Sequence, residues 1–263
     1  MGYIFDINDA VAYQEWFDNP KNKAGIELEN RLMLNMLEPI PRERVLDIGC
    51  GMGSSLLPFY EKGLLITGLD PSGHMLDIAA KHLGHRADLH SGFAENLPFD
   101  DNSFDYAILV KTLEFVEDPS QAIEEACRVA KNAVFVGVLN RHSLRGTRLR
   151  AQRIFADTVY KHAHFFSIWE LKQMIHDIVG DIPVSWRTVC QFSTAGGKIT
   201  SWIECSDLIQ RCPFGAFTGM TITLIPRFRT RPLELRTHTN RVCIVRGMAR
   251  IKTEIKKNGS IPL

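Results

Sequence analysis

Val45-Leu46-Asp47-Ile48-Gly49-Cys50-Gly51-Met52-Gly53 is an apolar strand that runs directly into a glycine-rich turn, and a helical segment follows it. Glycine tolerates positive φ and lets the backbone approach a ligand closely. In open α/β folds a turn of this kind lies at the carboxyl edge of a parallel sheet, where ligands bind. The stretch therefore predicts an α/β fold with a binding site at that edge.

Strand-like and helical segments alternate along the rest of the chain, which is typical of a parallel sheet covered by helices on both faces. Strands are expected over residues 44–48, 64–69, 87–92, 104–110 and 133–139. Helices are expected over residues 24–37, 71–83, 119–130 and 167–179, and Ser54 or Ser55 can cap a further one. Two late strands, 184–192 and 219–225, have no convincing helix between them, which predicts an antiparallel hairpin at one sheet edge.

Composition places the chain among ordinary globular proteins. It has 263 residues, of which 45% are hydrophobic and 23% charged, and this length can bury a large core. Disordered, collagen-like and disulfide-stapled classes are therefore excluded. The six cysteines form no C-x-x-C pair and no His/Cys cluster suggests zinc, so no metal is expected. Without a secretory signal or a long apolar run, we expect a cytoplasmic protein with no membrane span.

Charge is distributed unevenly. Residues 227–263 contain ten Lys/Arg and two Asp/Glu, a local charge of +8, so the rest of the chain carries −7. A basic segment of this kind either meets RNA, anionic lipid or an acidic partner, or is a solvated end that offsets the acidic body. The basic residues are spread over the whole segment rather than concentrated in one block, so we expect no nucleic-acid partner.

Two carboxylates flank the glycine loop and indicate the ligand. Asp70 ends the next strand, 21 positions after Gly49, where a carboxylate accepts hydrogen bonds from ribose hydroxyls. The loop spacing is G-x-G-x-G, not the G-x-G-x-x-G of dinucleotide folds, and Asp47 stands two residues before its first glycine. A carboxylate there would repel a diphosphate and attract an ammonium group. This pattern favours S-adenosylmethionine (SAM) over NAD.

Four motifs together resemble the class I SAM-dependent methyltransferases, and most nearly the type 11 branch that includes the ubiquinone/menaquinone C-methyltransferases. They are Val45 to Gly53, Gly68-Leu69-Asp70-Pro71-Ser72, Ala94-Glu95-Asn96-Leu97-Pro98-Phe99 and Ser103-Phe104-Asp105-Tyr106. The resemblance covers about residues 13–166. It implies a Rossmann-like three-layer sandwich with a seven-stranded, mostly parallel sheet, an antiparallel edge hairpin and SAM as the cofactor.

The resemblance also implies roles for individual residues. We expect an acid near the methionine ammonium and a second acid on the ribose hydroxyls. We also expect the glycine loop beneath the methionine and ribose, and further residues around the adenine and the methionine. The cofactor-binding residues are then Tyr13, Asp47, Gly49, Cys50, Gly51, Asp70, Pro71, Met75, Ala94, Glu95, Val110 and Lys111. For Tyr13 two interpretations stay open: a hydrogen bond to the methionine carboxylate, or one buried helical face shared with Trp16 and Phe17.

The sequence departs from the family pattern at two places. Many relatives carry an acid before the Ala-Glu pair, where this chain has Phe93, which either stacks on adenine or belongs to the core. Many also carry His-His after the fourth strand, where this chain has Leu113-Glu114-Phe115-Val116. The second departure bears on the substrate more than on the reaction class.

Catalytic candidates are harder to identify, because methyl transfer from a sulfonium needs mainly positioning of the reactants. A base is required only where the acceptor must lose a proton. Candidates that follow the fourth and fifth strands are Glu114, His142, Tyr160 and His164. Each also has a structural interpretation, as a loop-orienting or exposed side chain.

We therefore expect one methyltransferase domain over residues 1–263 that acts on a small-molecule acceptor. Its core would span about residues 24–226, its lid the N-terminal helix and residues 140–166, and its basic extension residues 227–263. The alternatives are a non-catalytic SAM-binding or regulatory protein and an NAD-dependent dehydrogenase. The acceptor atom and the oligomeric state are left open by the sequence.

Overall fold

The computed structural model describes residues 2–143, 162–190, 204 and 206–224. The chain divides into two units, Met1–Arg227 and Phe228–Leu263. The second unit lies outside the described residues, and so do residues 144–161 of the expected lid. The fold below is that of the first unit.

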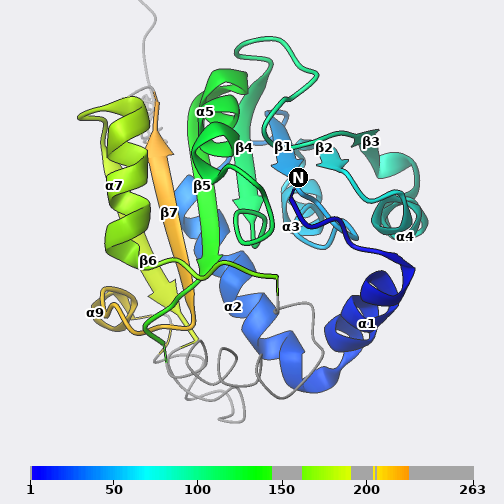
Figure 1. Ribbon diagram of the computed structural model, residues 1–263, viewed down its shortest axis with the longest axis horizontal. Helices are drawn as coiled ribbons and strands as arrows, with labels where there is room; N and C mark the ends of the chain where they lie inside the picture. Colours follow the sequence, from blue (N-terminus) through cyan, green and yellow to red (C-terminus); the bar gives the residue numbers. More distant parts are fainter. Residues whose placement is uncertain (1, 144–161, 191–203, 205, 225–263) are drawn as a thin grey trace, which may run out of the picture. The chain divides into compact units, whose positions relative to one another are not determined.

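One sheet of seven strands organises this unit, in the order β3-β2-β1-β4-β5-β7-β6 (Figure 1). Strands β1 to β5 run parallel to one another, and β7 runs antiparallel to both β5 and β6. The strands are β1 (Arg44–Ile48), β2 (Leu65–Asp70), β3 (Ala87–Ser91), β4 (Phe104–Val110), β5 (Ala130–Leu139), β6 (Val184–Val189) and β7 (Phe217–Thr223). The prediction of a mostly parallel seven-stranded sheet with an antiparallel edge pair is confirmed.

Helices cover both faces of the sheet and bury two separate apolar cores. Helices α5 and α7 pack on one face, and α2, α3 and α4 contribute side chains to the core on the other. The helices are α1 (Ile7–Asp18), α2 (Pro20–Leu37), α3 (Leu57–Glu61), α4 (Gly73–Leu83), the 3₁₀ turn η1 (Gly84–Arg86), α5 (Pro119–Val129), α7 (Ile168–Val179) and α9 (Asp207–Gln210). The arrangement is a three-layer sandwich.

Three local expectations need correction. Helix α2 begins at Pro20, because the Asn19 side chain accepts the N–H of Lys21 and proline suits the first helical turn. Neither expected serine caps the helix after the glycine loop: α3 begins only at Leu57, without a side-chain cap, and the Ser55 hydroxyl bonds Asp47 instead. The short helix α9 lies between β6 and β7, where no helix was expected.

Two glycines face each other across the β5–β7 pair. Gly137 is paired with Gly219, and the rings of Phe217 and Phe135 occupy the space that side chains would fill at these positions. A Cβ on Gly137 would overlap the ring of Phe217. The register of the antiparallel edge therefore depends on the absence of a side chain here.

We expect Gly137→Ala to lower the free energy of unfolding by about 1–3 kcal/mol, because the new methyl group overpacks against Phe217. Urea unfolding followed by circular dichroism measures this change. The matched control is Gly73→Ala in the first turn of α4, where a Cβ would meet no atom within 4 Å. Equal stability of the two variants would contradict the packing argument.

Candidate functional site

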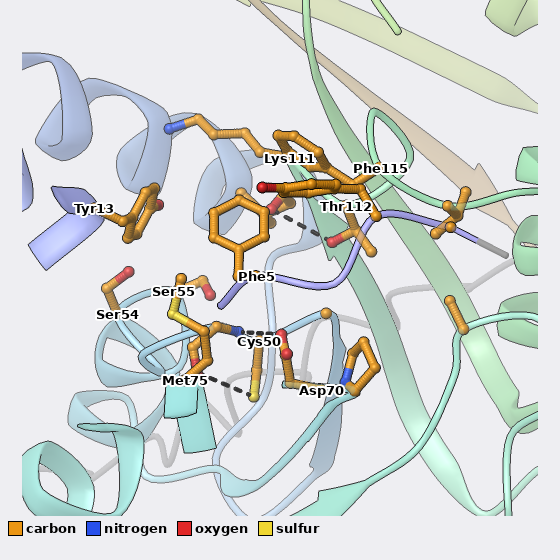
Figure 2. Close-up of a pocket in the computed structure, with 18 of the residues that line it drawn as sticks. Phe5, Tyr13, Cys50, Ser54, Ser55, Asp70, Met75, Lys111, Thr112 and Phe115 are labelled. Atoms are coloured by element: carbon orange, nitrogen blue, oxygen red, sulfur yellow. Dashed lines mark hydrogen bonds between the residues drawn. The ribbon is translucent and has the colours of Figure 1, made fainter. Parts of the chain in front are cut away.

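A cavity lies at the carboxyl edge of the sheet, where the strand order turns from β1 to β4 (Figure 2). Such a reversal of strand order is where open α/β sheets hold ligands. Its walls include all but one of the residues proposed from the sequence to bind the cofactor, namely Tyr13, Gly49, Cys50, Gly51, Asp70, Pro71, Met75, Ala94, Glu95, Val110 and Lys111. The exception is Asp47, which lies behind the wall.

The glycine loop forms the floor of the cavity. Gly49 and Gly51 have φ values of 74° and 52°, which are strained for other residues. A Cβ on Gly49 would collide with Thr112, whose hydroxyl donates to the carbonyl of Ile48 at 2.8 Å. At Gly51 a Cβ would meet no atom within 4 Å, so the loop leaves open space there. The backbone is thereby shaped for close approach of a ligand.

Asp70 holds this loop in place from the end of β2. One of its carboxylate oxygens accepts the N–H of Gly51 and the other the N–H of Ser72, both at 2.8 Å. The side chain is only 8% exposed, and burial raises the pKa of its carboxyl, while the two backbone hydrogen bonds oppose that rise. Asp70 therefore presents a fixed carboxylate to the cavity.

Asp47 is fully buried at the end of β1 and does not line the cavity. The Ser55 hydroxyl, which does line it, donates a hydrogen bond to Oδ2 of Asp47, whereas Oδ1 has no partner among the described residues. Burial raises the pKa of this carboxyl to about 7, and the Ser55 hydrogen bond opposes the rise. Any influence of Asp47 on a ligand therefore passes through Ser55 or through the unpartnered oxygen.

The end of β4 carries an ion pair that the sequence did not predict. Lys111 adopts a left-handed backbone conformation, with φ of 58°, and its ammonium lies 2.6 Å from a carboxylate oxygen of Glu29 on α2. Both side chains are largely buried, and both line the cavity. The Lys111 ammonium also lies 5.5 Å from the ring centre of Trp16. No local motif signals this pair, because its partners lie 82 positions apart.

The N-terminal segment before α1 also lines the cavity, which sequence reasoning missed. The N–H of Tyr3 donates to the carbonyl of Phe115 at 2.8 Å, and the carbonyl of Phe5 accepts the Ser72 hydroxyl at 2.7 Å. Residues 2–5 thus run from the loop after β4 to the start of α4. The ring of Phe5 lies between Tyr13 and Phe115 in Figure 2. Phe93 lines the cavity as well and is 40% exposed.

Among the catalytic candidates, Glu114 is the most buried. Its Oε1 accepts the N–H of Leu139 at 2.6 Å, and its Oε2 has no partner among the described residues. Burial raises the pKa of the Glu114 carboxyl to about 7, against the hydrogen bond from Leu139. The side chain is 1% exposed and does not line the cavity. This geometry ties the loop after β4 to the end of β5.

The histidine candidates lie on the surface. His142 is exposed and packs edge-on against Trp169, with ring centres 5.9 Å apart. His164 is exposed and pairs with Glu170 at 3.1 Å. Neither lines the cavity, and Tyr160 lies outside the described residues.

Within the described parts of the chain, no group of three or more His, Cys, Asp or Glu side chains could hold a metal ion. The helices in those parts are too short or too polar for any of them to cross a membrane.

Comparison with known proteins gives consistent results. Residues 46–136 match a family model described as a methyltransferase domain. An uncharacterized protein of Methanocaldococcus jannaschii is 33% identical over 177 residues, which cover 66% of this chain and 80% of that protein. A demethylmenaquinone methyltransferase of Renibacterium salmoninarum is 38% identical over 101 residues, 38% of this chain and 42% of that enzyme.

A similar solved structure, from Thermotoga maritima, is described as a SAM-dependent methyltransferase and possible histamine N-methyltransferase. It is 28% identical, with a TM-score of 0.67, over 83% of this chain and 97% of that one. The family assignment excludes the dehydrogenase alternative. Together with the seven-stranded sheet, these matches show that the chain belongs to the class I SAM-dependent methyltransferases.

Proposed function

We propose that the chain transfers the methyl group of SAM to a small-molecule acceptor held in the same cavity. The observation that carries the proposal is one cavity with two kinds of wall: the glycine loop and Asp70 at one side, aromatic side chains of α1 at the other. Names of relatives also support a small acceptor, since they include demethylmenaquinone methyltransferase and a ubiquinone biosynthesis O-methyltransferase.

The residues around the glycine loop suit this cofactor. Asp70 offers a fixed carboxylate for the ribose hydroxyls, and the open space at Gly51 admits a ligand against the backbone. The unpartnered Oδ1 of Asp47 favours a nearby positive charge, directly or through water. Phe93, Met75 and Pro71 provide apolar surface for a flat base. Tyr13 lines the same cavity, on the side proposed for the methionine end.

Bound SAM supplies a methyl group on a sulfonium, which is already an activated leaving group. The chain then needs to align the acceptor with that methyl and exclude water, and well-oriented reactants account for a large part of such rate enhancements. The N-terminal segment suits this task, because Tyr3 and Phe5 are hydrogen-bonded across the cavity to Phe115 and Ser72. We include this segment with α1 in the proposed lid; residues 144–161 of the expected lid lie outside the described residues.

S-adenosylhomocysteine should raise the melting temperature of the protein, and NAD should not, because the product shares the proposed contacts of the cofactor. Asp70→Ala should weaken S-adenosylhomocysteine binding by about 1–3 kcal/mol, since the ribose hydroxyls lose a charge-assisted acceptor. Differential scanning fluorimetry measures the shift in melting temperature, and isothermal titration calorimetry measures the change in affinity. The control is Asp77→Ala on the exposed side of α4, which should bind normally. Wild-type affinity in Asp70→Ala would remove Asp70 from the site.

The stability of the free protein should fall as pH rises from about 4 to about 7. The pKa of Asp47 is about 7 in the folded protein and near 3.8 in the unfolded chain. Between these two pH values the unfolded chain has released the proton that the folded protein still holds, so stability falls as the pH rises. The contribution is at most about 4 kcal/mol. Urea unfolding between pH 5 and pH 8 should show a shallower fall for Asp47→Asn. An unchanged pH profile would show that Asp47 does not titrate in this range.

We expect Glu114 to hold Leu139 in place through its hydrogen bond and not to act as a catalytic base. Glu114→Gln keeps an acceptor for the Leu139 N–H and should preserve stability and S-adenosylhomocysteine affinity at pH 7. Glu114→Ala leaves that N–H unsatisfied and should cost about 1–3 kcal/mol of stability. Urea unfolding and calorimetry distinguish the two. If the glutamine variant folds normally but loses ligand affinity, the charge of Glu114 serves the site.

A further inference from the structure

The cavity extends past the glycine loop and Asp70. Its remaining wall comes from helices α1 and α2, through Tyr13, Trp16, Phe17, Ile26, Glu29 and Asn30. We call this wall the α1–α2 compartment. In Figure 2, Tyr13 and the ammonium of Lys111 lie at one side of the cavity, and Asp70 and Cys50 at the other. The compartment is therefore separate from the proposed ribose site.

Aromatic rings form a continuous surface in this compartment. Tyr13 and Trp16 stack with ring centres 5.7 Å apart and an interplanar angle of 29°. Phe5 meets Tyr13 edge-on at 6.3 Å and Phe115 edge-on at 5.0 Å. All four rings are partly exposed and all line the cavity. Such a surface fits a flat, aromatic ligand.

A cation already lies at the end of this aromatic surface. The Lys111 ammonium lies between the Trp16 ring, at 5.5 Å, and Oε2 of Glu29, at 2.6 Å. Ring faces attract cations, and a largely buried carboxylate binds them strongly. Oε1 of Glu29 accepts no hydrogen bond from any residue that the structure describes. This oxygen is therefore available to a second donor.

The charges around the cavity also favour a positive ligand. The described side chains that line it include three acids, Glu29, Asp70 and Glu95, and one base, Lys111. Because Lys111 is already paired with Glu29, an anionic ligand would find no uncompensated cation on the described walls. An ammonium group would gain a charge-assisted hydrogen bond there.

We propose that the α1–α2 compartment recognises the methyl acceptor as an aromatic amine, with its ring against Tyr13 and Trp16 and its ammonium at Oε1 of Glu29. This inference rests on the proposed methyltransferase function, because it assigns the second compartment to the acceptor. Glu29 is then a specificity residue, and Lys111 fixes the position of its carboxylate.

The test uses the full chain loaded with S-adenosylhomocysteine and three probes that share an indole ring. Tryptamine is cationic, 3-methylindole neutral and indole-3-acetate anionic at pH 7. Calorimetry should give the tightest binding for tryptamine, at least about tenfold tighter than for indole-3-acetate, with 3-methylindole between them.

Variants then identify the groups responsible. Glu29→Gln should weaken tryptamine binding about tenfold and leave the affinity for 3-methylindole and for S-adenosylhomocysteine unchanged. The matched control is Glu27→Gln on the same helix, whose exposed side chain pairs with Arg31 away from the cavity; it should bind all probes normally. Trp16→Leu should weaken the three probes alike. If Glu29→Gln does not fold because Lys111 loses its partner, Glu29→Gln with Lys111→Met removes both charges and should still lower the affinity for tryptamine about tenfold relative to that for 3-methylindole.

Three results would overturn the inference: indole-3-acetate as the tightest ligand, no binding of any probe to the loaded protein, or unchanged tryptamine affinity in Glu29→Gln. Binding of S-adenosylhomocysteine is measured first. Its failure to bind would overturn the proposed function itself, and is thereby distinguished from failure of the amine probes.

Discussion

The carboxylate of Asp70 connects the parts of the carboxyl edge on which the site depends. It accepts the N–H groups of Gly51 and Ser72, so one buried side chain fixes both the glycine loop after β1 and the start of α4. Ser72 in turn caps α4 through Met75 and donates to the carbonyl of Phe5. The floor of the cavity and the N-terminal segment beside it are thus held by one continuous set of hydrogen bonds.

Two other carboxyls at this edge are buried although not all of their oxygens are hydrogen-bonded. Oδ1 of Asp47 and Oε2 of Glu114 have no partner among the described residues, and burial raises the pKa of each carboxyl to about 7. Buried polar atoms without partners are costly and uncommon in native proteins. In the proposed function a binding role would offset that cost at Asp47, because a positively charged ligand beside Ser55 would stabilise the ionised carboxylate. At Glu114 the bond to Leu139 supplies a structural reason instead.

The fold could be predicted from the sequence because its signals are local: apolar strands, helix ends and the glycine turn. The sequence also brought together most of the residues that line the cavity near the glycine loop, since they lie in short motifs at or just after the ends of β1, β2, β3 and β4. The α1–α2 compartment was not predictable in this way. Glu29 meets Lys111 across 82 positions, and Ser72 meets Phe5 across 67, without any sequence pattern that links them. Ser55 was misassigned as a cap because its hydroxyl bonds the buried Asp47 instead.

Lys111 shows how these two walls are held together. Its backbone N–H still donates to the carbonyl of Gly137 at 2.7 Å, so the residue continues the sheet although its φ of 58° is unfavourable. Such a conformation costs on the order of 1–3 kcal/mol and persists only where surrounding contacts compensate. The ion pair with Glu29 and the rings of Trp16 and Phe217 provide those contacts. A glycine would relieve the strain but would leave the Glu29 carboxylate without its partner and would sever this link between β4 and α2. The strained lysine therefore fixes the aromatic wall relative to the glycine loop, as in-line methyl transfer between the two proposed compartments would require.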